Sequence, residues 1–126
     1  MNDKPVILVV DDDAPILTLM HNLLREFGFE PLASATGSHA VATARQRRPD
    51  LILLDKNMPG MNGEDVIRAI RAEAALADVP ILILSGEPVE QDELAALGAN
   101  AAVQKPFDVP ALIGQIRTYL QTTASR

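Results

Sequence analysis

Three runs of consecutive aliphatic residues limit what this chain can fold into. They are Val6–Val10, residues 51–54 and residues 81–84, and each is bounded by polar residues, proline or glycine. Short apolar runs of this kind predict buried strands. Because the apolar residues are continuous, both faces of each strand should be covered, as in a parallel sheet between two layers of helices. Weaker strand patterns cover residues 30–35 and 101–104.

Helical patterns follow each of these strands. In the first, Asp13 is placed to cap the helix, Pro15 lies in its first turn and Gly28 ends it. The predicted helices cover residues 14–27, 37–48, 63–75, 88–97 and 108–120. Five alternating strand–helix units predict a doubly wound α/β sandwich. We expect one domain over the 126 residues, with its core at about residues 5–121 and a frayed tail at 122–126.

The composition argues against several classes of protein. A formal net charge of −6 argues against direct nucleic-acid binding by this domain, because phosphate contacts need clustered Lys and Arg. No apolar run approaches the roughly 18 residues of a membrane span, and the N-terminus lacks the features of a signal peptide. Without cysteine there is no disulfide and no zinc–thiolate site. We therefore expect a cytoplasmic protein that does not contact a membrane.

Polar side chains occupy the carboxyl ends of four predicted strands. Asp11 and Asp12 follow the first strand, Asp55 ends the third, Ser85 follows the fourth and Lys105 follows the fifth. Parallel strands end at one edge of a sheet, and open α/β folds bind their ligands there. Neighbouring carboxylates repel one another unless a cation intervenes, and Mg²⁺ is a cation that carboxylates and a phosphate hold together. The pattern predicts a site for a metal ion and a phosphoryl group.

Each of these residues also has an ordinary structural interpretation. Asp11 and Asp12 could form a solvated acidic turn. Ser85 could cap the helix that follows it, and Lys105 by itself would be a solvated strand end. The functional interpretation is preferred because these groups lie at the same predicted edge, where Lys105 is the expected counter-charge for the three carboxylates.

In this order, the motifs resemble the receiver domain of two-component response regulators over residues 6–120. The matching motifs are Asp11-Asp12, Asp55 followed by Met58-Pro59 and Gly63, Ser85-Gly86, and Gly98-Ala99 before Lys105-Pro106-Phe107. The resemblance implies a flavodoxin-like fold with five parallel strands in the order 2-1-3-4-5. It also implies a cis peptide bond between Lys105 and Pro106.

The same resemblance implies the function and the residues that carry it. Asp55 would accept a phosphoryl group from a sensor histidine kinase or a histidine phosphotransfer protein. The domain would then signal through a change of its surface, and it would not turn over an external substrate. The implied Mg²⁺ ligands are Asp12, Asp55, the backbone carbonyl of Asn57 and, through water, Asp11. Lys105 and Ser85 would contact the phosphoryl oxygens and assist the transfer to Asp55.

Two features depart from the family pattern. Family members carry Tyr or Phe three residues before the lysine, and this ring turns inward when Ser or Thr engages the phosphate; this chain has Ala102 there. The segment between Ser85 and Lys105 is also a couple of residues shorter than usual, which predicts a trimmed fourth helix. Without a large ring, we expect phosphorylation to order residues 85–97 rather than to rotate an aromatic side chain. The downstream partner stays open.

Two other functions fit parts of the pattern. Asp11-Asp12-Asp13 contains the Asp-x-Asp of small aspartyl-nucleophile phosphohydrolases, but this chain is short for that fold and Asp55 would be unexplained. A flavin-binding flavodoxin-like protein needs a phosphate loop rich in hydroxyls and glycine, and three carboxylates would repel the phosphate. Within the receiver interpretation, the sequence leaves open whether the domain acts alone, in a phosphorelay or as part of a larger protein.

Overall fold

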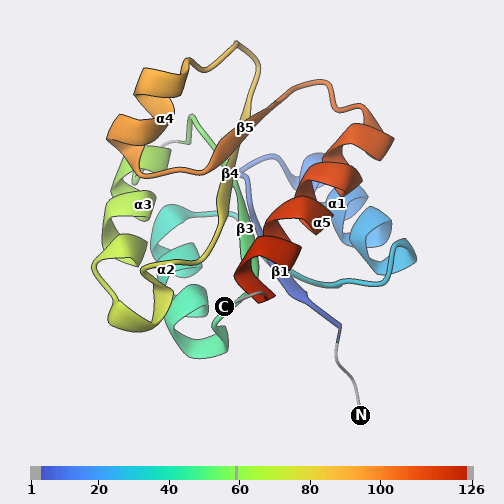
Figure 1. The fold of residues 1–126 in the computed structure, drawn as a ribbon, viewed down its shortest axis with the longest axis horizontal. Helices are drawn as coiled ribbons and strands as arrows, with labels where there is room; N and C mark the ends of the chain where they lie inside the picture. Colours follow the sequence, from blue (N-terminus) through green and yellow to red (C-terminus); the bar gives the residue numbers. More distant parts are fainter. Residues whose placement is uncertain (1–3, 59, 125–126) are drawn as a thin grey trace.

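A computed structural model describes residues 4–58 and 60–124 of the chain. Its centre is a five-stranded parallel sheet (Figure 1). The strands are β1 (Val6–Val10), β2 (Glu30–Ser34), β3 (Leu51–Asp55), β4 (Ile81–Ser85) and β5 (Ala101–Gln104). They lie in the order β2-β1-β3-β4-β5, which confirms the predicted doubly wound α/β fold and its strand order.

Helices cover both faces of the sheet. They are α1 (Ala14–Glu26), α2 (Gly37–Arg47), α3 (Gly63–Arg71), the short 3-10 turn η1 (Ala74–Leu76), α4 (Gln91–Leu97) and α5 (Val109–Ala124). The first and last helices, α1 and α5, pack on one face, and α2, α3 and α4 pack on the other (Figure 1). Within the described residues, no helix is long and apolar enough to cross a membrane.

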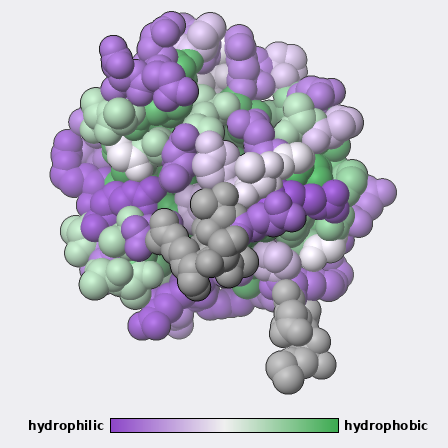
Figure 2. Space-filling view, in the orientation of Figure 1, coloured by the Kyte–Doolittle hydropathy of each residue, from purple (hydrophilic) through white to green (hydrophobic). Residues whose placement is uncertain are grey.

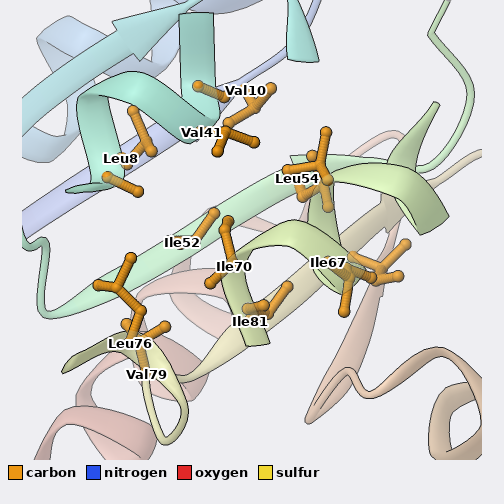
Figure 3. Close-up of a cluster of buried hydrophobic side chains, with 14 of the residues drawn as sticks. Leu8, Val10, Val41, Ile52, Leu54, Ile67, Ile70, Leu76, Val79 and Ile81 are labelled. Atoms are coloured by element: carbon orange, nitrogen blue, oxygen red, sulfur yellow. The ribbon is translucent and has the colours of Figure 1, made fainter. Parts of the chain in front are cut away.

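The aliphatic strands supply both halves of the core. Leu8 and Val10 of β1 belong to the half beneath α2 and α3. Their neighbours Ile7 and Val9 belong to the half beneath α1 and α5, because successive side chains of a strand point to opposite faces. The first half is drawn in Figure 3, where Ile70 lies over the strands. The face seen in Figure 2 by contrast carries many hydrophilic residues, with apolar ones between them.

Several element ends differ from the sequence predictions. The fourth helix begins at Gln91 and not at residue 88, because the Ser85 hydroxyl binds both backbone groups of Glu87 and holds residues 86–90 in a loop. The fourth strand, whose predicted bounds of 80–84 begin at the proline before the aliphatic run, is Ile81–Ser85, one residue later at each end. The third helix ends at Arg71, short of residue 75, and the chain continues into η1.

The last helix differs at its end. It runs to Ala124, beyond the predicted end at residue 120, and the frayed tail expected from residue 122 stays a prediction. The predicted tail residues 125–126, like Pro59 of the motif, lie outside them. Two other expectations are confirmed: α4 has only seven residues, and the peptide bond between Lys105 and Pro106 is cis.

The guanidinium of Arg71 joins several segments at the edge of the sheet where β4 and β5 begin. It donates hydrogen bonds of 2.7–3.3 Å to the carbonyls of Leu76, Ala77, Val79 and Gly98 and to Oδ1 of Asn100. Burial lowers the pKa of Arg71 from its usual value, and the nearby charge of Asp78 acts in the opposite direction. One side chain thereby holds the end of η1, the start of β4 and the turn after α4.

We expect Arg71→Met to lower the free energy of unfolding by about 2–3 kcal/mol, because several carbonyls would lose their donor. Urea unfolding followed by circular dichroism measures this change. Arg68→Met is the matched control, since Arg68 lies in the same helix and, in the part of the chain that the structure describes, pairs only with exposed carboxylates; its effect should stay below about 0.5 kcal/mol. Equal destabilisation by the two variants would contradict the role assigned to Arg71.

Candidate functional site

The polar strand ends noted in the sequence meet at one edge of the sheet. Asp11 directly follows β1, Asp55 and Ser85 are the last residues of β3 and β4, and Lys105 directly follows β5. These four strands are successive neighbours in the sheet, so their carboxyl ends lie side by side. The structure thus brings together groups that are up to 94 positions apart in the chain.

Three carboxylates form an acidic cluster at this edge. Asp11, Asp12 and Asp55 each offer an oxygen, and these oxygens lie within 4.8 Å of one another. Asp11 and Asp55 are buried, with 1% and 8% of their surface exposed, whereas Asp12 is exposed. Carboxylate oxygens are the ligands that Mg²⁺ prefers, and the accessible side of the cluster faces solvent at Asp12. The donor set therefore fits a divalent cation.

Lys105 is the counter-charge of this cluster. Its Nζ lies 3.2 Å from Oδ2 of Asp11 and 3.6 Å from Oδ1 of Asp55. Burial alone would lower the pKa of Lys105, but the hydrogen bond to Asp11 and the charges of both carboxylates outweigh it and raise that pKa. One ammonium against three carboxylates leaves net negative charge, which a cation can neutralise.

Burial and the neighbouring charges also change the pKa of Asp55. Its pKa is raised, first by burial and then by the charge of Asp11, while Lys105 and the backbone N–H of Asn57 act in the opposite direction. That N–H lies 3.4 Å from Oδ1 of Asp55. In the neighbouring loop, the N–H of Asp13 donates to Oδ1 of Asp11 at 3.0 Å, so backbone donors orient both buried carboxylates.

Gly63 lets α3 begin directly against the end of β3. A Cβ atom at this position would lie 3.0 Å from the carbonyl oxygen of Lys56 and 3.2 Å from that of Asp55, closer than side chains normally approach backbone. Asn62 caps the helix by accepting a hydrogen bond from the N–H of Asp65 at 3.0 Å. The glycine thereby keeps the loop after Asp55 tight.

Ser85 is buried and bonded within its own loop. Its hydroxyl donates to the carbonyl of Glu87 at 2.8 Å and accepts from the N–H of the same residue at 3.1 Å. It does not cap α4, because the cap position is Glu90, which makes no side-chain hydrogen bond. To reach a group on Asp55 as a donor, the hydroxyl would have to leave the Glu87 carbonyl.

Ala102 lies in β5 beside Ile83 of β4 and is half-buried. Val89, Leu97 and Ala99 belong to the same apolar cluster, so aliphatic side chains from α4 and its flanking loops fill this side of the core. The small side chain at position 102 is therefore accommodated by aliphatic packing from α4 and its flanking loops.

Two polar contacts near the site were not foreseen from the sequence. The ammonium of Lys56 pairs with the carboxylate of Glu93 at 2.6 Å, and the buried hydroxyl of Ser34 lies 2.8 Å from Nδ1 of His39. The carbonyl of Ser34 also accepts the N–H of Asp11 at 3.1 Å. The position of Lys56 directly after Asp55 could have drawn attention to this lysine. Nothing in the sequence, however, singled out Glu93 as its partner among the neighbouring acidic residues.

An apolar groove adjoins the site on the side of α1 and α5. It has a volume of about 470 Å³ and is lined by Ile16, Leu19, Leu23, Lys105, Pro106, Phe107 and Val109. Leu19 and Val109 are among the most exposed large apolar side chains in the described part of the chain. Because Lys105 belongs both to this groove and to the acidic cluster, the groove opens directly beside the site.

Comparisons with known proteins agree with this geometry. The family described as "Response regulator receiver domain" matches residues 7–117. The DNA-binding response regulator MtrA of Mycobacterium tuberculosis H37Rv is 39% identical over 117 residues, which are 91% of this chain and 50% of MtrA. The transcriptional regulatory protein PrrA of the same strain is 37% identical over 124 residues, which are 97% of this chain and 52% of PrrA. The chain thus spans about half the length of these relatives.

Solved structures of similar fold cover most of this chain. The chemotaxis protein CheY4 of Vibrio cholerae superposes with a TM-score of 0.88 at 31% identity, over 92% of this chain and 98% of CheY4. The receiver domain of the sensor histidine kinase PA1611 of Pseudomonas aeruginosa PAO1 superposes with a TM-score of 0.86 at 29% identity, over 94% of this chain and 98% of that domain. The latter structure holds a magnesium ion in its active site cleft.

In metal-free protein at pH 7, we expect Asp55→Asn to be more stable than the wild type by roughly 1 kcal/mol, the scale of a close carboxylate contact partly offset by Lys105. A carboxyl whose pKa is raised on folding binds its proton more tightly in the folded state, so its ionisation weakens the fold. The advantage of the variant should be absent below the ordinary pKa of 3.8 and should grow as the pH rises through the folded-state pKa.

Urea unfolding in EDTA across this pH range measures the difference. Asp92→Asn is the matched control, because Asp92 is an exposed carboxylate on α4 outside the cluster, and it should show no such pH-dependent gain. A difference between Asp55→Asn and wild type that is constant with pH would count against charge repulsion at Asp55.

Proposed function

This chain belongs to the response regulator receiver domain family, and on that basis we propose that Asp55 accepts a phosphoryl group from a histidine kinase or a histidine phosphotransfer protein. The observation that carries the proposal is the position of Asp55, at a strand end within reach of two further carboxylates and Lys105. The domain belongs to signalling proteins and not to turnover enzymes. We propose that it assists its own phosphorylation and dephosphorylation.

Magnesium is the proposed cofactor. Asp12 and Asp55 would hold it directly, together with the backbone carbonyl of Asn57, and Asp11 would act through water. The three carboxylates fit this ion by their charge and spacing. When bound, Mg²⁺ supplies positive charge that offsets the carboxylates and the incoming phosphoryl oxygens.

The remaining chemistry falls to the side chains. An oxygen of Asp55 attacks the phosphorus in line, so that a bond from this oxygen to phosphorus forms while the bond from phosphorus to the donor histidine nitrogen breaks. The ammonium of Lys105, already 3.6 Å from Asp55, binds a phosphoryl oxygen. The hydroxyl of Ser85 donates to another after it leaves the carbonyl of Glu87.

The signal would leave the site through the segment after Ser85. Because Ala102 provides no ring to rotate, the proposed change is an ordering of residues 85–97, which contain the loop bonded to Ser85 and α4. The core of this unit is proposed to be residues 5–121. A cytoplasmic location and the lack of direct nucleic-acid binding, both expected from the sequence, are parts of the same proposal.

The phosphohydrolase alternative is less well supported. It would use Asp11 as the nucleophile, but Asp11 is 1% exposed and its two oxygens bind the N–H of Asp13 and the ammonium of Lys105. Asp55 is more exposed than Asp11, and it stands where the resemblance to receiver domains implies the acceptor. Asp55 is therefore the better candidate.

Incubation with acetyl phosphate and Mg²⁺ should add one phosphoryl group to the wild type and none to Asp55→Asn. The reason is that, of the strand-end carboxylates, only Asp55 is proposed to bind Mg²⁺ directly and also to lie beside Lys105. Intact-protein mass spectrometry measures the added mass. EDTA should abolish the reaction, and Asp12→Asn should weaken Mg²⁺ binding by more than about tenfold, or about 1.4 kcal/mol. Phosphorylation found on Asp11 would instead support the phosphohydrolase.

The apolar groove beside Lys105 suits a protein phosphodonor. A phosphohistidine on another protein reaches Asp55 only if that protein covers the surface around the site, and the groove is the adjoining apolar surface. Acetyl phosphate is too small to use it. The groove should therefore matter for transfer from a protein and not for transfer from a small molecule.

We expect Leu19→Glu to slow phosphotransfer from a phosphorylated histidine kinase that is active on the wild type by roughly tenfold or more, because a charge would be buried in the contact. Its labelling by acetyl phosphate should stay within about twofold of wild type. Phe27→Glu is the control, since Phe27 is also exposed and apolar but is not part of the groove. Unchanged transfer to Leu19→Glu from the kinase would refute the use of the groove.

A further inference from the structure

The short helix α4 is attached differently at its two ends. At its C-terminus, the carbonyl of Gly98 accepts a hydrogen bond of 3.1 Å from Nε of Arg71. At its N-terminus, Glu93 pairs with Lys56 at 2.6 Å. Within the described residues, the Lys56–Glu93 pair is the only ion pair or hydrogen bond made by a side chain of α4. Apart from the burial of Leu94 in the core, the first turn of α4 is therefore held by Lys56.

Lys56 belongs to the acceptor site by its position in the chain. It directly follows Asp55, its N–H donates to the carbonyl of Leu84 at 3.0 Å, and its own carbonyl lies against Gly63. The backbone of Lys56 is thus held between β4 and α3. Its side chain carries the connection to α4.

A second tether of α4 also ends at the site. Residues 86–90 connect Ser85 to the helix, and the only side-chain hydrogen bonds found within them join Ser85 to Glu87. The cap residue Glu90 adds none. Both connections of the first turn of α4 therefore lead back to groups that flank Asp55.

We propose that the Lys56–Glu93 ion pair is a latch that holds α4 in its unphosphorylated position. The latch opens when Asp55 is phosphorylated and so frees α4 to take the second position, in which residues 85–97 become ordered. Lys56 and Glu93 are then positioning residues, and the inference rests on the proposed function. A phosphoryl group on Asp55 adds negative charge at the residue that directly precedes Lys56 in the chain, and this charge would compete with Glu93 for the Lys56 ammonium. Recruitment of Ser85 at the same time releases Glu87. The two side chains are 29% and 40% exposed, so the pair is weak enough to open.

The first test needs no phosphoryl group. Amide hydrogen exchange of α4 should be faster in Glu93→Gln than in the wild type, because the first turn loses its tether. Asp92→Asn is the matched control, since it removes the same charge from the same turn without touching Lys56. Equal acceleration in the two variants, or none in Glu93→Gln, would overturn the latch.

The second test uses linkage between the latch and the site. If phosphorylation opens the pair, opening it by mutation must favour the phosphorylated state. Glu93→Gln should therefore tighten the binding of beryllofluoride, a phosphoryl mimic, by about two- to fivefold in the presence of Mg²⁺. In a Lys56→Met background, the same substitution should have no effect on this affinity. Lys56→Arg should keep the wild-type affinity, because it keeps the pair.

The outcomes are separable. Tightening by Glu93→Gln that persists in the Lys56→Met background, or that is absent in the wild-type background, overturns the latch while the proposed function stands. A wild type that binds no beryllofluoride refutes the proposed function. In that case, the same mutant cycle measured on α4 exchange still decides whether Lys56 and Glu93 hold the helix.

Discussion

Repulsion among the carboxylates of Asp11, Asp12 and Asp55 is the constraint on which the carboxyl edge of the sheet depends. Their oxygens are held within 4.8 Å although two of the side chains are buried. The fold keeps them there with the ammonium of Lys105 and with backbone N–H groups of the adjoining loops. This compensation is incomplete, and the remaining negative charge is what makes the edge receptive to a cation and, with it, a phosphoryl group.

The opposite edge of the sheet is constrained in another way. There the guanidinium of Arg71 donates hydrogen bonds to the carbonyls that precede β4 and to the carbonyl of Gly98, which fixes the turn after α4. A helix with a fixed C-terminus, and with a first turn tethered by a partly exposed ion pair and by the loop bonded to Ser85, can move about its fixed end once these tethers open. Events at the acidic edge would therefore reach the surface through the first turn of α4. Ala102, which packs against the same apolar cluster as Leu94, has no large ring to obstruct such a shift.

Local signals explain which parts of this structure were predictable. The cap at Asp13 and the buried strands depend on residues close in sequence, and they lie where the sequence predicted them. The ends of α3 and α4 were misplaced because Arg71 and Ser85, through contacts formed only in the fold, decide where each helix stops or starts. The apolar groove was missed because α1 and the segment after Lys105 are far apart in the chain.

The amino-acid sequence by itself determined the doubly wound sheet and the set of polar groups at its carboxyl edge. Continuous aliphatic strands must be buried on both faces, and parallel strands must end at the same edge. Only the tertiary structure decided how those groups are paired: Lys105 with Asp11 and Asp55, the Ser85 hydroxyl with Glu87, and Lys56 with Glu93. Ion pairs and hydrogen bonds act over a few ångströms, and the distances between residues remote in sequence are set by how the helices pack on the sheet.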